Sequence, residues 1–438
     1  MPRCHRIRHP FPKLFVLFVI WTGQSCFGIT DEEIFRNFQF SFVNPGARSS
    51  AMGNAFLALA DDATAAEANP AGLTILTKPE VSLEYRNVQY DAERLNARNN
   101  TITELEIFET TSVNDLNQLN RLSFFSIVFP RGRNTFAFSR QEAVRIKGSI
   151  DELFTVDVSN QVGFPLVIEG GALGEVDQTV VNWNFSAARK VGERFTIGAS
   201  LRLSQLDWQT RVENFKIFEN QASDQFQTIT DESDFSFGWN AGILYRLDSQ
   251  VTLGVVYKRN PRFEVTGVEA GPAAQKPGTF NNVLKIPDTF GAGLSVKFGE
   301  FLILCSDIVH VQYSDLLEGF EAGYNFLTDI YDNGDLTYGI KDAYEFHAGV
   351  EFILIYKDLP IALRQGYYRK PSNSLFVTSV PGQILEDDLI IRAIFQELES
   401  ENHITIGNGF VFSNFQVDWA FDASKSVDTF ILSSVFRF

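Results

Sequence analysis

Three basic side chains could hold the charged end of a ligand inside this protein. Arg202, Lys258 and Arg364 each lie in a run where apolar and polar residues alternate, and strand parity places them on the polar face. A carboxylate removed from water needs a positive partner, because an unpaired buried charge is costly. The competing interpretation is that each forms a structural ion pair with an acid of the same face, such as Asp418 or Asp422.

Residues that usually carry catalysis or bind metal ions are scattered along the chain. No glycine-rich phosphate loop or nucleophile elbow occurs. Beyond residue 28 the histidines suggest neither a zinc site nor a triad, and the spacing of three aspartates fits no calcium loop. These residues are His310, His347 and His403, and Asp329, Asp332 and Asp335. We therefore predict no enzyme activity, no cofactor and no metal site; an outer-membrane lipase or protease is the weak alternative.

Composition excludes several classes of protein. A net charge of −17 argues against a nucleic-acid partner, because phosphate binding needs clustered Lys and Arg. An aromatic content of 13%, including 42 Phe, excludes intrinsic disorder. After residue 28 no apolar run approaches the roughly 18 residues that a membrane-spanning helix needs.

Alternation of apolar and polar residues is the dominant pattern from residue 81 onward, as in Phe415, Val417, Trp419 and Phe421. A period of two is typical of strands with two unlike faces. Reading all such runs predicts fourteen strands, near 81–91, 121–130, 134–145, 179–190, 194–211, 233–247, 250–265, 286–298, 301–313, 343–356, 359–370, 402–413, 415–424 and 427–438.

The connections between these strands indicate a membrane protein. Six are tight turns, and they alternate with long connections at 92–120, 146–178, 212–232, 266–285, 314–342 and 371–401. An even strand count with short turns at one end and long loops at the other is typical of outer-membrane barrels. A closed sheet also gives every backbone group a partner in lipid. The sequence therefore predicts an all-β, 14-stranded antiparallel transmembrane β-barrel over residues 81–438.

The first 28 residues are predicted to be a secretory signal peptide. A basic start is followed by the apolar stretch Leu14–Trp21 and by small residues ending at Gly28. A single-helix anchor and a lipoprotein signal ending at Cys26 are the alternatives. After cleavage Cys305 is the last remaining cysteine, so no internal disulfide forms and ring closure must hold the fold.

Residues 29–80 do not alternate, and we expect them to form a hatch, or plug, in the barrel lumen. Asp62 is predicted to cap a short helix over 63–68, which ends at Asn69-Pro70 because the residue before proline avoids the helical region. A loose periplasmic tail is the alternative. At the other end, Phe436 and Phe438 share a face of the last strand, and we interpret Phe438 as a tag for the barrel-insertion machinery.

Four features of the sequence occur in the same order as in one known family. The first is Ala60-Asp61-Asp62-Ala63 followed by Asn69-Pro70-Ala71. The others are 237–245 with Leu247-Asp248, Lys341-Asp342-Ala343-Tyr344 with Gly349, and the strand count with the terminal Phe. Together they are similar to the long-chain fatty acid transporter family of Gram-negative outer membranes, the FadL and TodX type. The hatch also resembles that of PorV-like barrels.

The resemblance implies passive uptake of hydrophobic small molecules such as long-chain fatty acids through the outer membrane. In that family ligand lands between outer loops, enters a pocket inside the barrel and leaves sideways into membrane lipid. The polar run 139–142 hints at the break in strand three that such an exit needs. The family's basic ligand contacts fall nearest to Arg211 and Lys341. A PorV-like scaffold or shuttle for exported proteins is the alternative.

Two predicted outer loops are more apolar than solvated loops usually are. Leu316, Leu317 and Phe320 recur at helical spacing, as do Ile391, Phe395 and Leu398. We expect two helices that form the groove where hydrophobic ligand is captured. Packing against each other as a lid is the equally weighted alternative.

Overall fold

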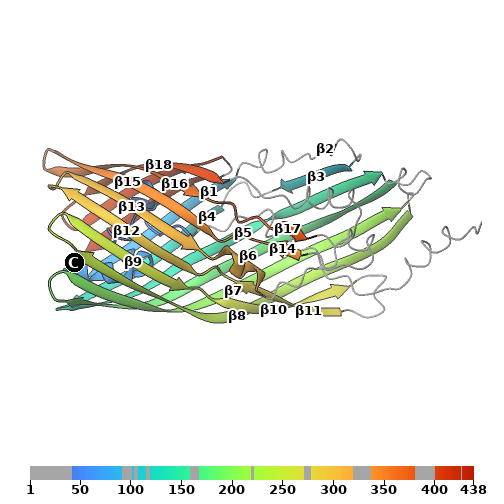
Figure 1. Ribbon diagram of the computed structural model, residues 1–438, viewed down its shortest axis with the longest axis horizontal. Coiled ribbons are helices and arrows are strands. Elements are labelled where there is room, and N and C mark those ends of the chain that lie inside the picture. Colours follow the sequence, from blue (N-terminus) through green and yellow to red (C-terminus); the bar gives the residue numbers. More distant parts are fainter. Residues whose placement is uncertain are drawn as a thin grey trace, which may run out of the picture.

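The computed structural model describes residues 42–90, 101–102, 107–114, 119–157, 167–218, 221–270, 278–318, 337–379, 400–425 and 427–438. Its main feature is one antiparallel sheet that closes on itself, because the first strand pairs with the last along their whole length. Figure 1 shows the barrel with its short turns and the C-terminus at the left end. The predicted signal peptide lies outside the described residues.

Fourteen strands make up the wall, as the sequence predicts. The sheet contains β1 (Glu80–Tyr90), β2 (Thr101–Ile102), β3 (Ile107–Asn114), β4 (Leu119–Arg131), β5 (Asn134–Asp157), β6 (Val167–Val191), β7 (Phe195–Phe218), β8 (Gln221–Arg246), β9 (Val251–Arg259), β10 (Arg262–Ala270), β11 (Gly278–Lys285), β12 (Thr289–Phe298), β13 (Leu302–Val311), β15 (Ala343–Tyr356), β16 (Leu359–Lys370), β18 (Glu401–Val411), β19 (Phe415–Ala423) and β20 (Val427–Arg437). β9 with β10, and β11 with β12, are halves of single wall strands, and β2 and β3 are additions beyond the wall. A separate pair joins β14 (Thr337–Gly339) to β17 (Phe376–Ser379).

The predicted strand ends were wrong on one side of the barrel. β5 to β8 continue far into the segments predicted as the long connections 146–178 and 212–232. They form the part of the barrel that projects to the right in Figure 1. A transmembrane strand needs about 9–11 residues, whereas these have 24 to 26. Beyond the lipid both faces meet water, so the alternation that marks the lower part of each strand fades.

Two wall strands are each broken at a proline. Pro261 separates β9 from β10, so the strand predicted at 250–265 is not continuous, and 286–288, with Pro287 at the centre, separates β11 from β12. β11 lies in the segment predicted as the connection 266–285, so this wall strand starts earlier than the predicted 286–298. Proline has no N–H to give to a ladder. Lys285 Nζ closes the break by donating to the carbonyl oxygens of Asn260, at 3.2 Å, and Ile286, at 2.7 Å.

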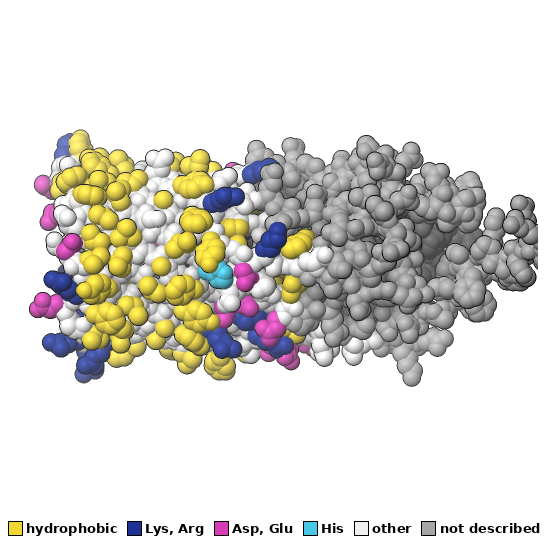
Figure 2. Space-filling view, viewed as in Figure 1, with side chains coloured by type: hydrophobic (Ala, Val, Ile, Leu, Met, Phe, Trp, Pro, Cys, Tyr) yellow, Lys and Arg dark blue, Asp and Glu magenta, His cyan; other side chains and the backbone are white. Residues whose placement is uncertain are grey.

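The outside of the barrel is apolar. Hydrophobic side chains cover much of it in Figure 2, and charged side chains gather at the short-turn end and again at the opposite edge of the coloured surface. Phe185, Phe237 and Ile355 are 59%, 70% and 76% exposed, which suits contact with lipid and not with water. No helix among the described residues is long and apolar enough to cross a membrane.

Residues 42–79, which we call the N-terminal segment, lie inside the barrel. The segment contains α3 (Ala47–Ala51), α4 (Ala65–Ala68) and the 3₁₀ turn η1 (Pro70–Ile75), and most of its side chains are fully buried. α3 packs on β16 and β18 to β20, whereas η1 packs on β4 to β8, so the segment crosses the lumen. Residues 29–41 of the segment predicted to be the hatch lie outside the described part.

The local structure of the N-terminal segment corrects one detail. α4 begins after Thr64, not after Asp62 as predicted; the Asp62 carboxylate instead accepts from the Thr64 N–H, at 2.8 Å. Asn69 has an extended backbone and ends α4 before Pro70, as predicted.

Inward-facing glycines let the segment approach the wall. A Cβ on Gly349 or Gly366 would meet the backbone of Met52 and Gly53. The wall strands and the segment therefore pack backbone against backbone.

Candidate functional site

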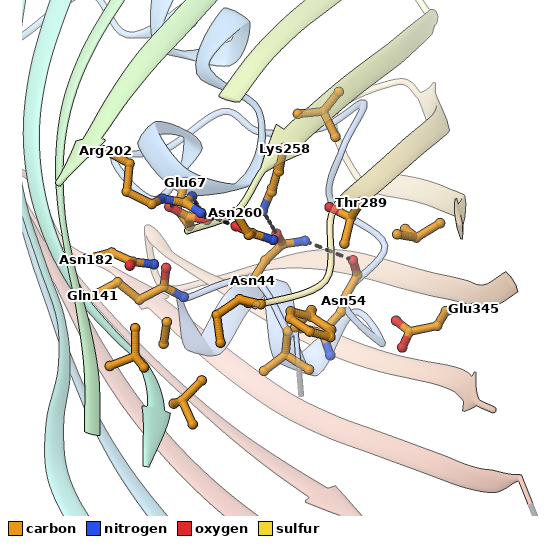
Figure 3. A pocket seen from close by; sticks show the side chains of 18 of the residues that line it. Asn44, Asn54, Glu67, Gln141, Asn182, Arg202, Lys258, Asn260, Thr289 and Glu345 are labelled. Atoms are coloured by element: carbon orange, nitrogen blue, oxygen red, sulfur yellow. Dashed lines mark hydrogen bonds and ion pairs between the residues drawn. The ribbon is translucent and has the colours of Figure 1, made fainter. Parts of the chain in front are cut away.

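A buried carboxylate of the N-terminal segment binds two cations of the barrel wall (Figure 3). Arg202 on β7 donates through Nη2 to both oxygens of Glu67, at 2.6 and 2.8 Å. Lys258 on β9 lies 3.3 Å from the same carboxylate. Burial acts to raise the pKa of Glu67, but the charges of Arg202 and Lys258 outweigh it and lower this pKa below its usual value. Glu67 is therefore ionised near neutral pH.

Two asparagines fix the geometry of this cluster. Asn184 accepts from Arg202 Nε, at 3.0 Å, and donates to Glu67, at 3.1 Å. Asn260, at the break between β9 and β10, accepts from Arg202 Nη1. Arg202 is only 2% exposed, so its charge depends on these partners.

A cavity opens beside the cluster. The volume within it that a water-sized molecule can occupy is about 60 Å³, and part of it is open to solvent. Polar side chains of the N-terminal segment and of the wall face one part of it in Figure 3. The apolar part of the lining includes Val144, Val180, Val256, Ile286 and Val309. The cavity therefore offers a greasy surface with a polar patch, which suits an amphiphilic or hydrophobic guest.

The barrel wall is interrupted next to this cavity. β4 pairs with β5 only as far as Phe124 opposite Gln141, whereas on its other edge β4 pairs with β1 up to Leu119. Among the described residues, 142–148 of β5 have no backbone partner on the β4 side. Gln141 and Ala143 also line the cavity, so the interruption and the cavity adjoin.

A bulge accompanies the interruption. The pairing of β5 with β6 shifts between Glu142 and Val144, directly after the polar run that was predicted to interrupt strand three. Side chains bridge the opening: Arg140 donates to the Leu122 carbonyl, at 2.8 Å, and Arg121 lies 3.2 Å from Glu142. Side chains move more easily than a backbone ladder, so this stretch of the wall is held less firmly than a fully paired one.

A second ion network lies away from the cavity. Arg48 of the N-terminal segment contacts Asp61, at 2.5 Å, and Glu351 on β15, at 2.9 Å. Arg364 on β16 lies 2.6 Å from Glu351 and 2.7 Å from Asp418. The structural interpretation weighed for Arg364 is therefore the one that the geometry supports.

The basic residues predicted to contact the ligand lie in different parts of the barrel. Arg202 and Lys258 line the cavity, but their partner is Glu67. Arg211 on β7 is exposed, and Lys341 is exposed with its ammonium 5.2 Å from the centre of the Phe376 ring. Register along a strand does not bring either to the cavity.

The predicted capture groove is only partly described. Leu316 is fully buried, in a short 3₁₀ turn (η2, Tyr313–Leu317) and not in a longer helix. Phe320 and Phe395, like Asp329, Asp332 and Asp335, lie outside the described residues.

The sequence analysis missed two cavity residues of the N-terminal segment, Glu67 and Asn54. The signal for Glu67 was present: it is a single acid among alanines in Ala63–Ala68, in a segment expected to be buried. A buried acid demands a cation. Asn54 had no such signal, because its position depends on the left-handed backbone at that residue, with φ of 60°.

Known proteins share the sequence pattern and the fold of this chain. A family model described as outer membrane protein transport protein (OMPP1/FadL/TodX) matches residues 37–374. No curated protein matches the chain.

Several solved structures share the fold. A Pseudomonas aeruginosa FadL homologue matches with a TM-score of 0.62 at 14% identity, over 92% of this chain and 99% of its own. The CymD monoaromatic hydrocarbon channel matches at 0.58 and 15% identity, and the toluene transporter TbuX of Ralstonia pickettii at 0.58 and 14%; each match covers 91% of this chain and 99% of the other.

Proposed function

The chain belongs to the OMPP1/FadL/TodX family of hydrophobic-compound channels in the outer membrane of Gram-negative bacteria, and from that premise we propose that it takes up hydrophobic small molecules passively. Ligand enters from the end with the long loops, occupies the cavity beside Glu67 and leaves sideways into lipid between β4 and β5. Long-chain fatty acids are one candidate class. Aromatic hydrocarbons are another, since proteins of this fold include a toluene transporter and a monoaromatic hydrocarbon channel.

One observation carries this proposal: the cavity adjoins residues 142–148 of β5, which lack a backbone partner on the β4 side in the described part of the chain. A molecule in the cavity therefore has a short path to lipid that breaks no ladder hydrogen bond. A lateral path suits greasy cargo, because water need not be crossed again after capture.

In this proposal the N-terminal segment acts as the hatch that blocks the lumen below the cavity. Support comes from its burial and from its ties to opposite walls, through Glu67 at one side and Arg48 at the other. A blocked lumen directs ligand to the side and keeps hydrophilic solutes out.

Removal of the bulge tests the route. Deleting Ala143 would let β5 pair with β6 without the shift between Glu142 and Val144, straighten β5 and bring it toward β4. We expect uptake of a hydrophobic ligand by whole cells to fall by at least about tenfold, while the purified protein still binds that ligand. Ala143→Gly, which keeps the bulge, is the matched control and should transport normally. Normal uptake by the deletion variant would refute the lateral route.

A further inference from the structure

The cavity contains a buried amide with nothing to bind. Asn54 is 3% exposed, and within the described part of the chain neither its side-chain oxygen nor its side-chain nitrogen has a hydrogen-bond partner. It lines the cavity and lies beside Asn44 in Figure 3. Buried polar groups are almost always paired, because an unpaired one costs its full desolvation energy. A donor and an acceptor are thus held at the cavity wall.

The backbone explains why an asparagine is tolerated at this position, but not why a buried amide without a partner stands in the cavity lining. Asn54 has a φ of 60°, a left-handed conformation that asparagine, aspartate and glycine adopt with little strain. Glycine would satisfy that requirement without burying two unpaired polar atoms. The side chain therefore adds a property that the fold does not need.

Each lysine and arginine of the cavity lining has an acidic partner. Glu67 and Glu345 are the acids of the lining, and its basic residues are Arg202, Lys258 and the histidine His347. Arg202 and Lys258 both contact Glu67, whereas Glu345 accepts from the Tyr313 hydroxyl, at 2.9 Å, and lies 3.4 Å from His347. A carboxylate entering the cavity would find no lysine or arginine without an acidic partner, and it would have to compete with Glu67 for Lys258. Such a ligand is disfavoured by desolvation.

We propose that the cavity recognises amphiphiles with a neutral head group that both donates and accepts a hydrogen bond, and that Asn54 determines this specificity. Hydroxyl and amide heads meet the requirement; an ionised carboxylate and a pure hydrocarbon do not. The head binds the Asn54 amide, and the apolar tail contacts the valines that line the cavity. This inference rests on the proposed uptake of hydrophobic molecules and names the class that is taken up.

Four ligands of one chain length test the proposal: dodecane, 1-dodecanol, dodecanamide and dodecanoate at pH 8. Their dissociation constants are measured with the purified full chain in lipid nanodiscs, after subtracting partition into empty discs. We expect the alcohol and the amide to bind about tenfold more tightly than dodecanoate, and more tightly than dodecane. If none of the four binds, the proposed function fails. If dodecanoate or dodecane binds as tightly as the neutral-headed ligands, this inference fails while the proposed function stands.

Two variants place the recognition at Asn54. Asn54→Gly keeps the left-handed backbone and removes both hydrogen bonds, so binding of the alcohol and the amide should weaken about tenfold while dodecane binding is unchanged. Asn54→Asp keeps the size but removes the donor and adds a third acid. It should weaken dodecanamide several-fold and dodecanoate further still.

The matched control is Asn373→Gly. Asn373 is 2% exposed and has an unpaired side-chain oxygen, but it does not line the cavity. Binding of all four ligands should be unchanged in this variant. Barrel assembly is checked for each variant by its altered gel mobility before and after heating. If folded Asn54→Gly binds the alcohol and the amide as tightly as the wild type, the proposal fails. If the glycine variant does not assemble, the same result with Asn54→Asp overturns it. In either case solvent, not a ligand head group, occupies the site beside Asn54.

Discussion

At the scale of single residues, one carboxylate organises the lumen. The carboxylate of Glu67 pairs with the charge of Arg202 and also contacts Lys258, and these contacts attach α4 to β7 and β9. Buried ion pairs contribute little net stability, but breaking one leaves a charge without a partner. The contacts therefore specify where the N-terminal segment sits more than they stabilise the barrel.

Replacement of Glu67 should release this part of the segment. Glu67→Ala leaves Arg202 buried with only asparagine partners, which we expect to cost about 3–5 kcal/mol locally. Amide hydrogen exchange of α4 and η1 should become much faster, while the central wall strands stay protected. Glu264→Ala on β10, where the side chain is 68% exposed, is the control and should change nothing. Slow exchange of α4 in the Glu67 variant would contradict the role given to this residue.

At the scale of elements, the fit between the N-terminal segment and the wall depends on the absence of side chains. A Cβ at Gly366 would meet the backbone of Gly53 and Met52, and one at Gly349 the backbone of Met52. Backbone atoms of a packed segment do not yield as a flexible side chain does. These positions therefore decide whether the segment can occupy its place.

A larger residue at Gly366 should displace the segment without preventing closure of the barrel. Gly366→Val is expected to increase ion conductance in planar bilayers, since the lumen is then less completely filled. Gly278→Val on β11 is the matched control, because a Cβ there meets nothing within 4 Å. Equal conductance of the two variants would show that the segment tolerates the added side chain.

The strands were more predictable than the site. Alternation such as that of Phe415–Phe421 reports which face a residue occupies, and it predicted all fourteen wall strands. It does not report depth or the partner across the lumen, so Arg202 was assigned to the inner face correctly but Glu67 was not recognised as its partner. The breaks at Pro261 and Pro287 carried a local signal that the alternation concealed.

At the scale of the whole molecule, closure of the ring replaces covalent cross-links. β1 and β20 pair from Glu80–Arg437 to Tyr90–Val427, and the Glu80 and Arg437 side chains meet at 2.7 Å. The one cysteine of the described residues, Cys305, is buried and free. The seam between the two ends of the chain therefore determines whether a barrel forms.

The terminal aromatic belongs to this seam. The Phe438 N–H donates to the Pro79 carbonyl, at 3.2 Å, and its ring lies 5.7 Å from that of Phe436. If Phe438 is the tag for the insertion machinery, its deletion should lower the amount of assembled barrel in outer-membrane fractions several-fold. Phe412→Ser, at an exposed aromatic on the last residue before another turn, should assemble normally. If both variants give equal amounts of assembled barrel, Phe438 is not a tag for insertion.

The height of β5 to β8 has a consequence for the proposed uptake. The 26 residues of β8 extend roughly 85 Å along the strand, of which about a third lies at the level of the hydrocarbon. This side of the wall thus extends into the aqueous surroundings, well above the acyl chains of the outer leaflet. In the proposed uptake, sparingly soluble cargo that reaches the cavity along this wall would arrive from the water, at a rate that depends on its dissolution.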